Sequence, residues 1–333
     1  FREGTLGAGE AYLEGWWDCE QLDVLFCKAL HAHLENKVRH NLPNALVVAS
    51  QLLFNLQSVA RAPMVAEQHY NMDNAMFARM LGPTMNYSCG YWKNAGTLDE
   101  AQRNKMELIC RKLDLQEGMS VLDIGCGWGG LSLYMAREYG VKVTGVTIST
   151  EQFAYAREHD AGHLVNWLLE DYRSLKGQFD RIVSVGMFEH VGRKNYDIFM
   201  KTTKRLLKPS GLFLLHTIGN SKKKTGTDPW INKYIFPNGM LPSPVCVAKA
   251  ITGRYVMEDW HNFGADYDKT LMAWHQRFEE GYAEGAFQCS ERVRRMYRYY
   301  LLSCAGAFRA RDIQLWQIVL SPEGVEGGYC CQR

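Results

Sequence analysis

Short apolar runs alternate with amphipathic segments from about residue 120 to the end of the chain. The runs have the length of buried strands, and the segments between them have apolar residues at helical spacing. Repeated strand–helix units predict an α/β fold, a seven-stranded parallel sheet with helices on both faces. The predicted strands are Ser120–Ile124, Val141–Thr147, Val165–Leu169, Phe179–Val185, Gly211–Ile218, Arg254–Glu258 and Leu315–Leu320. The predicted helices are Asp99–Leu113, Leu131–Tyr139, Glu151–Glu158, Asn195–Leu206, Asp268–Glu279 and Ser290–Arg309.

The first part of the chain follows a different pattern. Gln21–Leu34 has apolar residues on one helical face, and Ala45–Val59 is strongly apolar. Ala45–Val59 has two interpretations: a helix packed inside a small helical domain, or an apolar face inserted into a lipid surface. Pro63 interrupts the helical pattern. We therefore predict an N-terminal helical, lipid-docking domain over residues 1–62 and a catalytic domain over residues 63–333.

The stretch Val121–Gly130 is the strongest single signal in the chain. An apolar run that predicts a buried strand breaks into glycines at 125, 127, 129 and 130, and a helical pattern resumes at Leu131. Strand, tight glycine turn and helix bring backbone N–H groups and a helix N-terminus close to a ligand. A Cβ at these glycines would hold the ligand away or forbid the turn. The stretch therefore predicts a nucleotide-like ligand.

Polar residues after the next strands indicate which ligand binds. A nicotinamide dinucleotide site would place an acid about 20 residues after the glycines, where it binds the ribose. Here the second strand ends at Thr147 without an acid, and Gln152 follows it. Asp123 can pair with an ammonium group, and Asp171 and Tyr172 follow the third strand. This set suits the amino acid, ribose and adenine of S-adenosylmethionine better than a pyrophosphate.

Composition narrows the class of protein. The 333 residues are 47% hydrophobic, enough for one large core and a smaller second domain. The formal charge of +2 implies no field that attracts nucleic acid. The 10 cysteines lack the spacing of a zinc site, so we predict reduced thiols, no metal centre and a cytoplasmic location. No apolar segment reaches the ~18 residues that cross a bilayer, and Phe1 in place of methionine predicts that residues precede it in the natural protein.

Several motifs together resemble one family, the cyclopropane-fatty-acyl-phospholipid synthases with the related mycolic acid cyclopropane synthases. The resemblance extends over nearly the whole chain, and the length of the N-terminal stretch is similar to that of the phospholipid-acting bacterial branch. The motifs are Tyr87–Trp92, Leu122–Gly130, Gly145–Ser149, Ser184–Gly192, Leu214–Gly219, Asp228–Gly239, Met257–Tyr267 and Ala305–Arg311. The glycine turn alone would not be specific, but the full set is.

The resemblance implies an activity. In this family the methyl of S-adenosylmethionine is transferred to a cis double bond of an unsaturated phospholipid acyl chain, and a bound bicarbonate then takes a proton so that a cyclopropane ring closes. The positions matching the family's bicarbonate site are Cys89, Glu189, His216, Tyr267 and the backbone of Ile218. Alkene attack needs no base, but the resulting carbocation must lose a proton in a dry pocket before water intervenes.

The resemblance also implies the contacts to S-adenosylmethionine. Matched by motif, these are Tyr87, Ser88, Gly125, Gly127, Thr147, Ile148, Gln152, Asp171 and Tyr172. Gly125 and Gly127 follow from the glycine turn as well, whereas Tyr172 lies in the segment that diverges most within the family.

Each predicted catalytic residue also has a structural interpretation. His216 can be a hydrogen-bonded core histidine, Cys89 a small buried hydrophobe, and Tyr267 can cap a turn. Glu189 is the strongest candidate from the sequence alone, because an acid at the carboxyl end of a strand seldom serves packing. We expect Glu189 to hold His216 or to share a proton with bicarbonate, since two like charges in a dry pocket repel. We expect Cys89 to position and not to attack.

Two rival functions stay open: a methyltransferase that leaves a methyl-branched lipid, and a non-catalytic lipid-binding protein. On the main interpretation, the partners are unsaturated phospholipid acyl chains at the membrane surface, and the protein associates peripherally with the inner membrane. We place docking on Ala45–Val59 with Lys37 and Arg39. The resemblance to the phospholipid-acting branch implies a homodimer.

Overall fold

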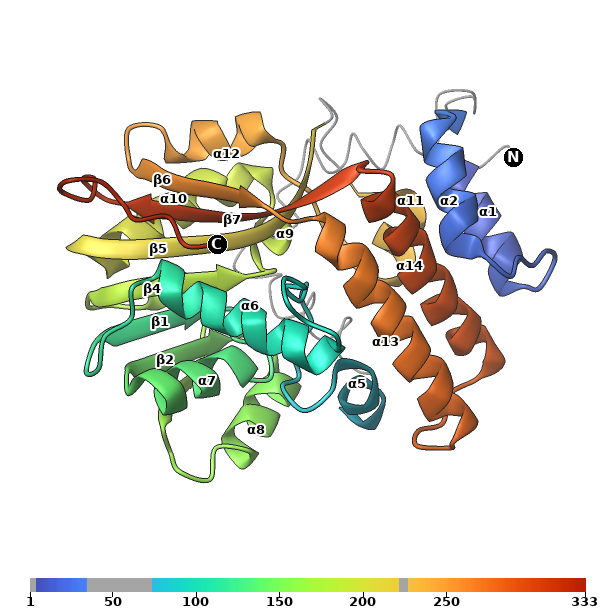
Figure 1. Ribbon diagram of the computed structural model, residues 1–333, viewed down its shortest axis with the longest axis horizontal. Coiled ribbons are helices and arrows are strands. Elements are labelled where there is room, and N and C mark those ends of the chain that lie inside the picture. The colour runs from blue at the N-terminus through green and yellow to red at the C-terminus, as the bar shows by residue number, and fades with distance from the viewer. Residues whose placement is uncertain (1–3, 35–73, 222–226) are drawn as a thin grey trace.

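The structure is a computed structural model that describes residues 4–34, 74–221 and 227–333. Figure 1 shows a sheet with helices on both faces and further helices beyond one end of its strands. The strands are β1 (Ser120–Ile124), β2 (Lys142–Thr147), β3 (Val165–Leu169), β4 (Phe179–Val185), β5 (Leu207–Asn220), β6 (Val256–Asn262) and β7 (Ile313–Ser321). The helices are α1 (Gly4–Leu13), α2 (Leu22–His31), α5 (Asn74–Leu81), α6 (Leu98–Lys112), α7 (Gly130–Tyr139), α8 (Thr150–Glu158), α9 (Phe188–Val191), α10 (Tyr196–Leu206), α11 (Pro229–Tyr234), α12 (Pro244–Ile251), α13 (Ala265–Ala283) and α14 (Glu291–Arg309), with 3-10 turns η2 (Tyr172–Ser174) and η3 (Arg193–Asn195).

The sheet has seven strands in the order β3-β2-β1-β4-β5-β7-β6. Inside it, Val121 of β1 is in register with Val143 of β2 and with Arg181 of β4. Val121 faces the core beneath α6 and α7, whereas Leu122 and Ile124 face the core beneath α9, α10 and α12. A strand buried on both faces has a continuous apolar sequence. The α/β prediction is confirmed, and β1, β3 and β4 have the predicted bounds.

The prediction of a wholly parallel sheet is wrong for the last strand. β7 runs antiparallel to both neighbours, β5 and β6. After β6 the chain leaves the sheet into α13, and α14 returns it to the same edge through short connections at 263–264 and 310–312. The hairpin begins and ends at the same ends of the strands and does not cross a face of the sheet. The strand that follows it, β7, therefore runs antiparallel to β6. The apolar pattern of Leu315–Leu320 identified the strand but does not encode its direction.

The helices beyond the strand ends share one core with the N-terminal helices. Tyr12 of α1 and Leu22 of α2 are fully buried in the same cluster as Trp230 and Tyr299. The Tyr299 ring lies 5.4 Å from Tyr12 and 4.4 Å from Trp230, centroid to centroid. Figure 1 shows α1 and α2 beside α14. The sequence did not predict α1, because its apolar residues have little helical periodicity.

Several predictions for the N-terminal part lie outside the described residues. They include the boundary between residues 62 and 63 and the docking candidates Ala45–Val59, Lys37 and Arg39. No helix of the described ranges is long and apolar enough to span a membrane. In the same ranges, no group of three or more His, Cys, Asp or Glu side chains is placed to hold a metal ion. The ten cysteines are all free thiols.

The close packing at Gly130 gives a prediction about stability. A Cβ there would lie 1.9 Å from the carbonyl oxygen of Thr84, so Gly130→Ala forces the backbone apart. We expect a loss of about 2 kcal/mol or more in the free energy of unfolding and a fall of several degrees in the thermal midpoint. Gly96→Ala is the matched control, because its nearest new neighbour, Glu100 Oε2, lies at 3.6 Å. Equal midpoints for the two variants would contradict the prediction.

Candidate active site

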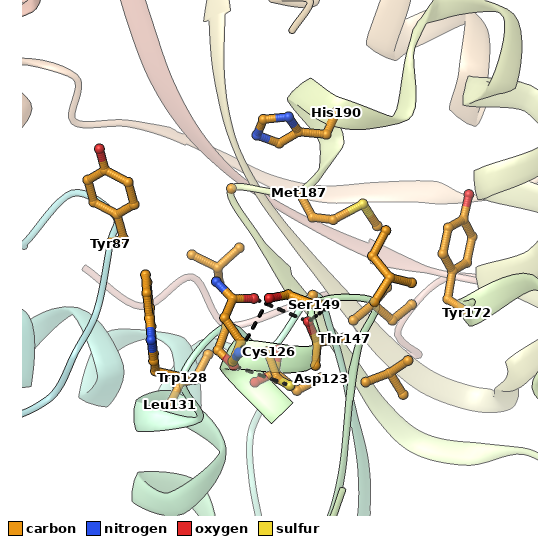
Figure 2. Close-up of a pocket in the computed structure, with 18 of the residues that line it drawn as sticks. Tyr87, Asp123, Cys126, Trp128, Leu131, Thr147, Ser149, Tyr172, Met187 and His190 are labelled. Carbon is orange, nitrogen blue, oxygen red and sulfur yellow. Dashed lines mark hydrogen bonds between the residues drawn. The ribbon is translucent and has the colours of Figure 1, made fainter. Parts of the chain in front are cut away.

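A pocket lies beyond the carboxyl ends of β1, β2 and β4, where ligands bind in parallel sheets. Figure 2 shows Tyr87 and Trp128 on one side of it, Tyr172 on the opposite side and His190 above. The residues predicted to bind S-adenosylmethionine all line this pocket: Tyr87, Ser88, Gly125, Gly127, Thr147, Ile148, Gln152, Asp171 and Tyr172. The structure thus brings together residues from four separate segments of the chain.

The glycine turn lines the pocket with backbone atoms that carry no side chains. Gly125 and Gly127 have φ values of +79° and +57°, in the left-handed region that favours glycine. A Cβ on Gly125 would lie 2.9 Å from the Met187 side chain. A Cβ on Gly127 would meet no protein atom within 4 Å, because the space beside it is the pocket. Both glycines are therefore required by the turn, and Gly127 also leaves room for a ligand.

Asp123 is a buried acid that lines this pocket, which we call the donor pocket because the predicted contacts to the methyl donor line it. Asp123 is the last residue but one of β1, is 2% exposed and accepts a hydrogen bond from the Ser132 hydroxyl at 2.7 Å. Burial raises the pKa of Asp123 to about 6, although Ser132 and Lys105 oppose the rise. The second carboxylate oxygen is left for a ligand. A cationic ligand such as an ammonium group would lower the pKa again and hold the carboxylate ionised.

The ends of β2 and β3 present hydroxyl, amide and carboxylate groups. Thr147 Oγ1 donates to Gln152 Oε1 at 3.2 Å and accepts from the Ser149 backbone at 3.2 Å. This leaves the Gln152 amide nitrogen for a ligand. Burial raises the pKa of Asp171, but a two-point contact from Arg173, at 2.8 and 2.5 Å, outweighs it and keeps the pKa below its usual value. An ionised Asp171 can accept hydrogen bonds from a ribose or an adenine amine.

The five residues predicted for the anion site lie in a second, buried region next to the pocket. None of them lines the donor pocket itself. Cys89, Glu189, His216 and Tyr267 are between 0% and 8% exposed and come from α9, β5, α13 and, for Cys89, the segment between α5 and α6. Burial is the main cause of the raised pKa of Tyr267. The charges of Cys89 and Glu189 raise it further, so both groups lie near Tyr267.

The contacts differ from the expected pairing of Glu189 with His216. Glu189 Oε1 accepts a hydrogen bond of 2.6 Å from the backbone N–H of Ile218. His216 Nδ1 lies 3.3 Å from the amide nitrogen of Gln317 instead. Glu189 Oε2, His216 Nε2 and Gln317 Oε1 are buried without a hydrogen-bond partner among the described residues. Buried polar atoms are nearly always paired, so these three indicate a place for a small polar ligand.

Burial sets the protonation states of this region. It raises the pKa of Glu189 to about 7, and the amide of Ile218 lowers it only in part. It lowers the pKa of His216 well below its usual value, with help from the charges of Lys105 and Lys112, so the imidazole is neutral. It raises the pKa of Cys89 well above its usual value, so the thiol keeps its proton. A protonated thiol is a weak nucleophile, which agrees with a positioning role for Cys89.

Two supporting residues were missed by the sequence analysis. Thr270, fully buried on α13, accepts hydrogen bonds from Gly90 N at 3.1 Å and Trp92 Nε1 at 2.9 Å, and its hydroxyl lies 3.8 Å from the Cys89 sulfur. Gln317 is fully buried on β7. The signal for Gln317 was present, because a lone glutamine inside an apolar strand needs a polar partner. Thr270 carried no such signal, since threonine is common in helices that face solvent.

The fold and the pocket define a class of protein. A seven-stranded sheet in this order, with a reversed seventh strand and a glycine turn after β1, is the fold of the S-adenosylmethionine-dependent methyltransferases. A family model described as mycolic acid cyclopropane synthetase matches residues 57–318. The chain belongs to this family.

Individual relatives agree with that assignment. A cyclopropane-fatty-acyl-phospholipid synthase of Escherichia coli strain K12 is 58% identical over 327 residues, 98% of this chain and 85% of that protein. A probable fatty acid methyltransferase of Pseudomonas putida is 37% identical over 265 residues, 75% of this chain and 67% of that protein. The crystal structure of mycolic acid cyclopropane synthase CmaA1 complexed with SAH and CTAB is 32% identical with a TM-score of 0.70, and the match covers 78% of this chain and 97% of that one.

The raised pKa of Glu189 predicts how stability depends on pH. The unfolded carboxyl ionises near 4.5, whereas the buried one keeps its proton until about pH 7. Its contribution to stability is therefore full below pH 4.5 and is lost as the pH rises to 7. Glu189→Gln cannot ionise, so the variant should gain about 3 kcal/mol relative to the parent across this window, at 1.36 kcal/mol per pKa unit. Urea unfolding at a series of pH values measures the difference, and a pH-independent difference would contradict the prediction.

The hydroxyl of Thr270 gives a second prediction. Thr270→Val keeps the shape of the side chain but leaves the N–H groups of Gly90 and Trp92 buried without an acceptor. We expect a loss of about 2–4 kcal/mol in the free energy of unfolding. Thr270→Ser is the matched control, because it keeps the hydroxyl and loses only a methyl group, worth about 1 kcal/mol. Urea unfolding distinguishes them, and a serine variant as unstable as the valine variant would refute the role of the hydroxyl.

Proposed function

We propose that the protein transfers the methyl group of S-adenosylmethionine to the cis double bond of an unsaturated phospholipid acyl chain and closes a cyclopropane ring with bicarbonate as the base. The observation that supports this best is that Glu189 Oε2 and His216 Nε2 are both buried without a hydrogen-bond partner among the described residues. The carbocation left by methyl transfer to an alkene must lose a proton, and a base held by such polar atoms would take it. The similarity to the Escherichia coli cyclopropane-fatty-acyl-phospholipid synthase supports the same substrate class.

The donor pocket supplies groups for each part of S-adenosylmethionine. The Asp123 carboxylate would bind the ammonium group, and the bare backbone at Gly127 would lie against the amino acid portion. Thr147 and Gln152 would bind the ribose hydroxyls, and Asp171 would accept from the ribose or the adenine. Together these residues would hold the donor beside the buried region.

The buried polar atoms fit a small anion with both an O–H group and free oxygens. The residues that would hold bicarbonate are Glu189, His216, Tyr267 and Cys89. The backbone N–H of Ile218, the fifth predicted contact, donates its hydrogen bond to Glu189. When bound there, bicarbonate supplies the base that takes the proton from the transferred methyl. A protonated Glu189 would donate to it and avoid the repulsion between two negative charges. A neutral His216 can donate or accept at Nε2, because its other nitrogen lies at Gln317.

Aromatic side chains surround this region and exclude water. The Tyr267 ring stacks on Phe308 at 4.5 Å, and Phe263 lies 5.9 Å from the His216 ring. Water would capture a carbocation before ring closure, so a dry wall is a requirement of the chemistry. The π-faces also stabilise a nearby positive charge.

A second candidate function has one observation in its favour. A relative from Pseudomonas putida is named a probable fatty acid methyltransferase, and the donor pocket alone would serve such an enzyme equally well. The carbocation left by methyl transfer would then lose a proton from a neighbouring carbon to give a methyl-branched alkene, or would need a hydride donor to give a saturated branched chain. Because proton loss needs a base whether a ring or an alkene forms, ring closure is favoured instead by the 58% identity to the Escherichia coli cyclopropane-fatty-acyl-phospholipid synthase.

Membrane association and assembly complete the proposal. Acyl double bonds lie deep in a bilayer, so the enzyme would dock on the cytoplasmic face of the membrane and draw a chain toward the donor. The residues placed in this role by the sequence, Lys37, Arg39 and Ala45–Val59, lie outside the described part of the chain. We further propose a homodimer, as the phospholipid-acting branch implies.

One assay tests the proposed reaction. The protein is incubated with labelled S-adenosylmethionine and vesicles of a monounsaturated phospholipid, and the released acyl chains are analysed by gas chromatography. We expect a labelled cyclopropane product, and we expect its yield to fall in buffer freed of bicarbonate. A methyl-branched product would support the second candidate, and no incorporation would contradict both.

A variant pair locates the chemistry within the same assay. Glu189→Gln should lower the rate of ring formation about 100-fold or more, the usual contribution of a placed proton-transfer group. Glu117→Gln, at an exposed position in the connection between α6 and β1, is the matched control and should leave the rate unchanged. Full turnover by Glu189→Gln across the working pH range would remove Glu189 from the proposed site.

A further inference from the structure

Lys105 is a fully buried lysine on α6 that the proposed reaction does not yet use. It has no exposed surface, and Nζ donates a hydrogen bond of 2.8 Å to Ser88 Oγ. Among the described carboxylates none forms an ion pair with it; Asp123 acts on it only through its charge. Burial lowers the pKa of Lys105 to about 7, and the charges of Cys89 and Asp123 raise it only in part, so its charged form depends on nearby negative charge. A buried lysine without an ion-pair partner is unfavourable and rare. Its presence here points to a role for the charge.

The position of Lys105 is the junction between the two predicted sites. Ser88 lines the donor pocket, and the next residue, Cys89, belongs to the buried anion site. Gln102, one turn before Lys105 on α6, donates from Nε2 to the Ser88 carbonyl at 2.8 Å. Gln102 therefore holds the backbone of this segment, and Lys105 holds the side chain that faces the donor.

The charge of Lys105 reaches groups in both sites. Burial is the larger influence on each group, because it raises the pKa of Asp123 and of Cys89 and lowers that of His216. The positive charge of Lys105 then lowers the pKa of all three. Asp123 lies in the donor pocket, and Cys89 and His216 lie in the anion site, so one cation influences both.

The charged form of Lys105 fixes the orientation of the Ser88 hydroxyl, because an ammonium can only donate hydrogen bonds. In its charged form Lys105 has three donors and no acceptor, so the Ser88 oxygen then accepts in this contact. The hydroxyl proton of Ser88 is then available to a ligand in the donor pocket. An anionic acceptor, such as the carboxylate of an amino acid, fits that proton and the nearby positive charge.

We propose that Lys105 is a positioning residue shared by the two sites. It orients the Ser88 hydroxyl as a donor toward the carboxylate of the methyl donor, and its ammonium supplies positive charge to an anion in the buried region that begins at Cys89, the residue after Ser88. An anion bound there would in turn favour the charged form of the lysine. The second statement rests on the proposed function, whereas the first requires only that the pocket binds the donor.

The same helix provides a matched control. Lys112 is also fully buried, but its Nζ lies 3.2 Å from Asp259 Oδ2 and 3.2 Å from His261 Nδ1. It does not line the donor pocket or contact a residue that does so. Lys112→Met therefore removes a buried ammonium of equal size without removing a contact to Ser88.

Calorimetric titration with S-adenosylhomocysteine tests the donor side. We measure Kd for the parent, Lys105→Met, Ser88→Ala, the double variant and Lys112→Met, after thermal unfolding shows that each is folded. We expect Lys105→Met and Ser88→Ala each to raise Kd about tenfold and the double variant to raise it no further, because the lysine acts through Ser88. We expect Lys112→Met to stay within about twofold of the parent. An unchanged Kd for Lys105→Met, or equal losses in both lysine variants, would overturn the proposal.

Turnover at a series of bicarbonate concentrations tests the anion side. Lys105→Met should raise the bicarbonate concentration for half-maximal rate about tenfold, whereas Ser88→Ala, which faces only the donor, should leave it within about twofold. An unchanged bicarbonate requirement in Lys105→Met would overturn the second statement. If turnover of the parent shows no dependence on bicarbonate, the proposed base and the anion role of Lys105 both fail, and the titration still decides the donor role.

Discussion

Exclusion of water from the carboxyl edge of the sheet is the constraint on which the rest of the site depends. The hairpin of α13 and α14 covers this edge and places Tyr267 and Phe308 over the strand ends. Glu189 and His216 lie beneath it, with 6% and 1% of their surfaces exposed. Burial is the largest influence on the pKa of each, and it favours the neutral form of both. The helices that cover the site therefore set its protonation state, more than any single contact inside it does.

The reversed direction of β7 has a chemical consequence. In the antiparallel pair, His216 lies directly opposite Gln317, and opposite residues share one face of the sheet. A slip of one residue would place Trp316 or Ile318 there and leave His216 Nδ1 buried without a partner. The topology thus determines which nitrogen of His216 is held and which stays available. The hairpin of α13 and α14, which covers the site, and β7, which holds His216 through Gln317, follow one another directly in the sequence.

The residues that line the pocket could be grouped from the sequence because their signals are local. A strand, its glycine turn and the first polar residues after each strand lie within a few positions of one another, and the structure brings them into one pocket. The direction of β7 could not be predicted, since it follows from where α14 returns to the sheet. Lys105 was missed for a different reason: on an amphipathic helix a lysine is normally assigned to the solvent face. Thr270 and Gln317 were missed because their partners are remote in sequence.

Residues 87–92 are where the two halves of the site are joined. Tyr87 and Ser88 line the donor pocket, and Cys89 lies in the core beside Thr270. Because these residues are consecutive, the separation of the donor pocket from the proposed anion site is fixed by the covalent chain and not by packing between domains. A segment without regular secondary structure has no backbone hydrogen-bond pattern of its own that would hold it. Side chains of α6 and α13 provide hydrogen bonds instead: Gln102 and Lys105 from α6, and Thr270 from α13. Rigid placement of both sites thus depends on side chains that touch neither the transferred methyl nor its acceptor.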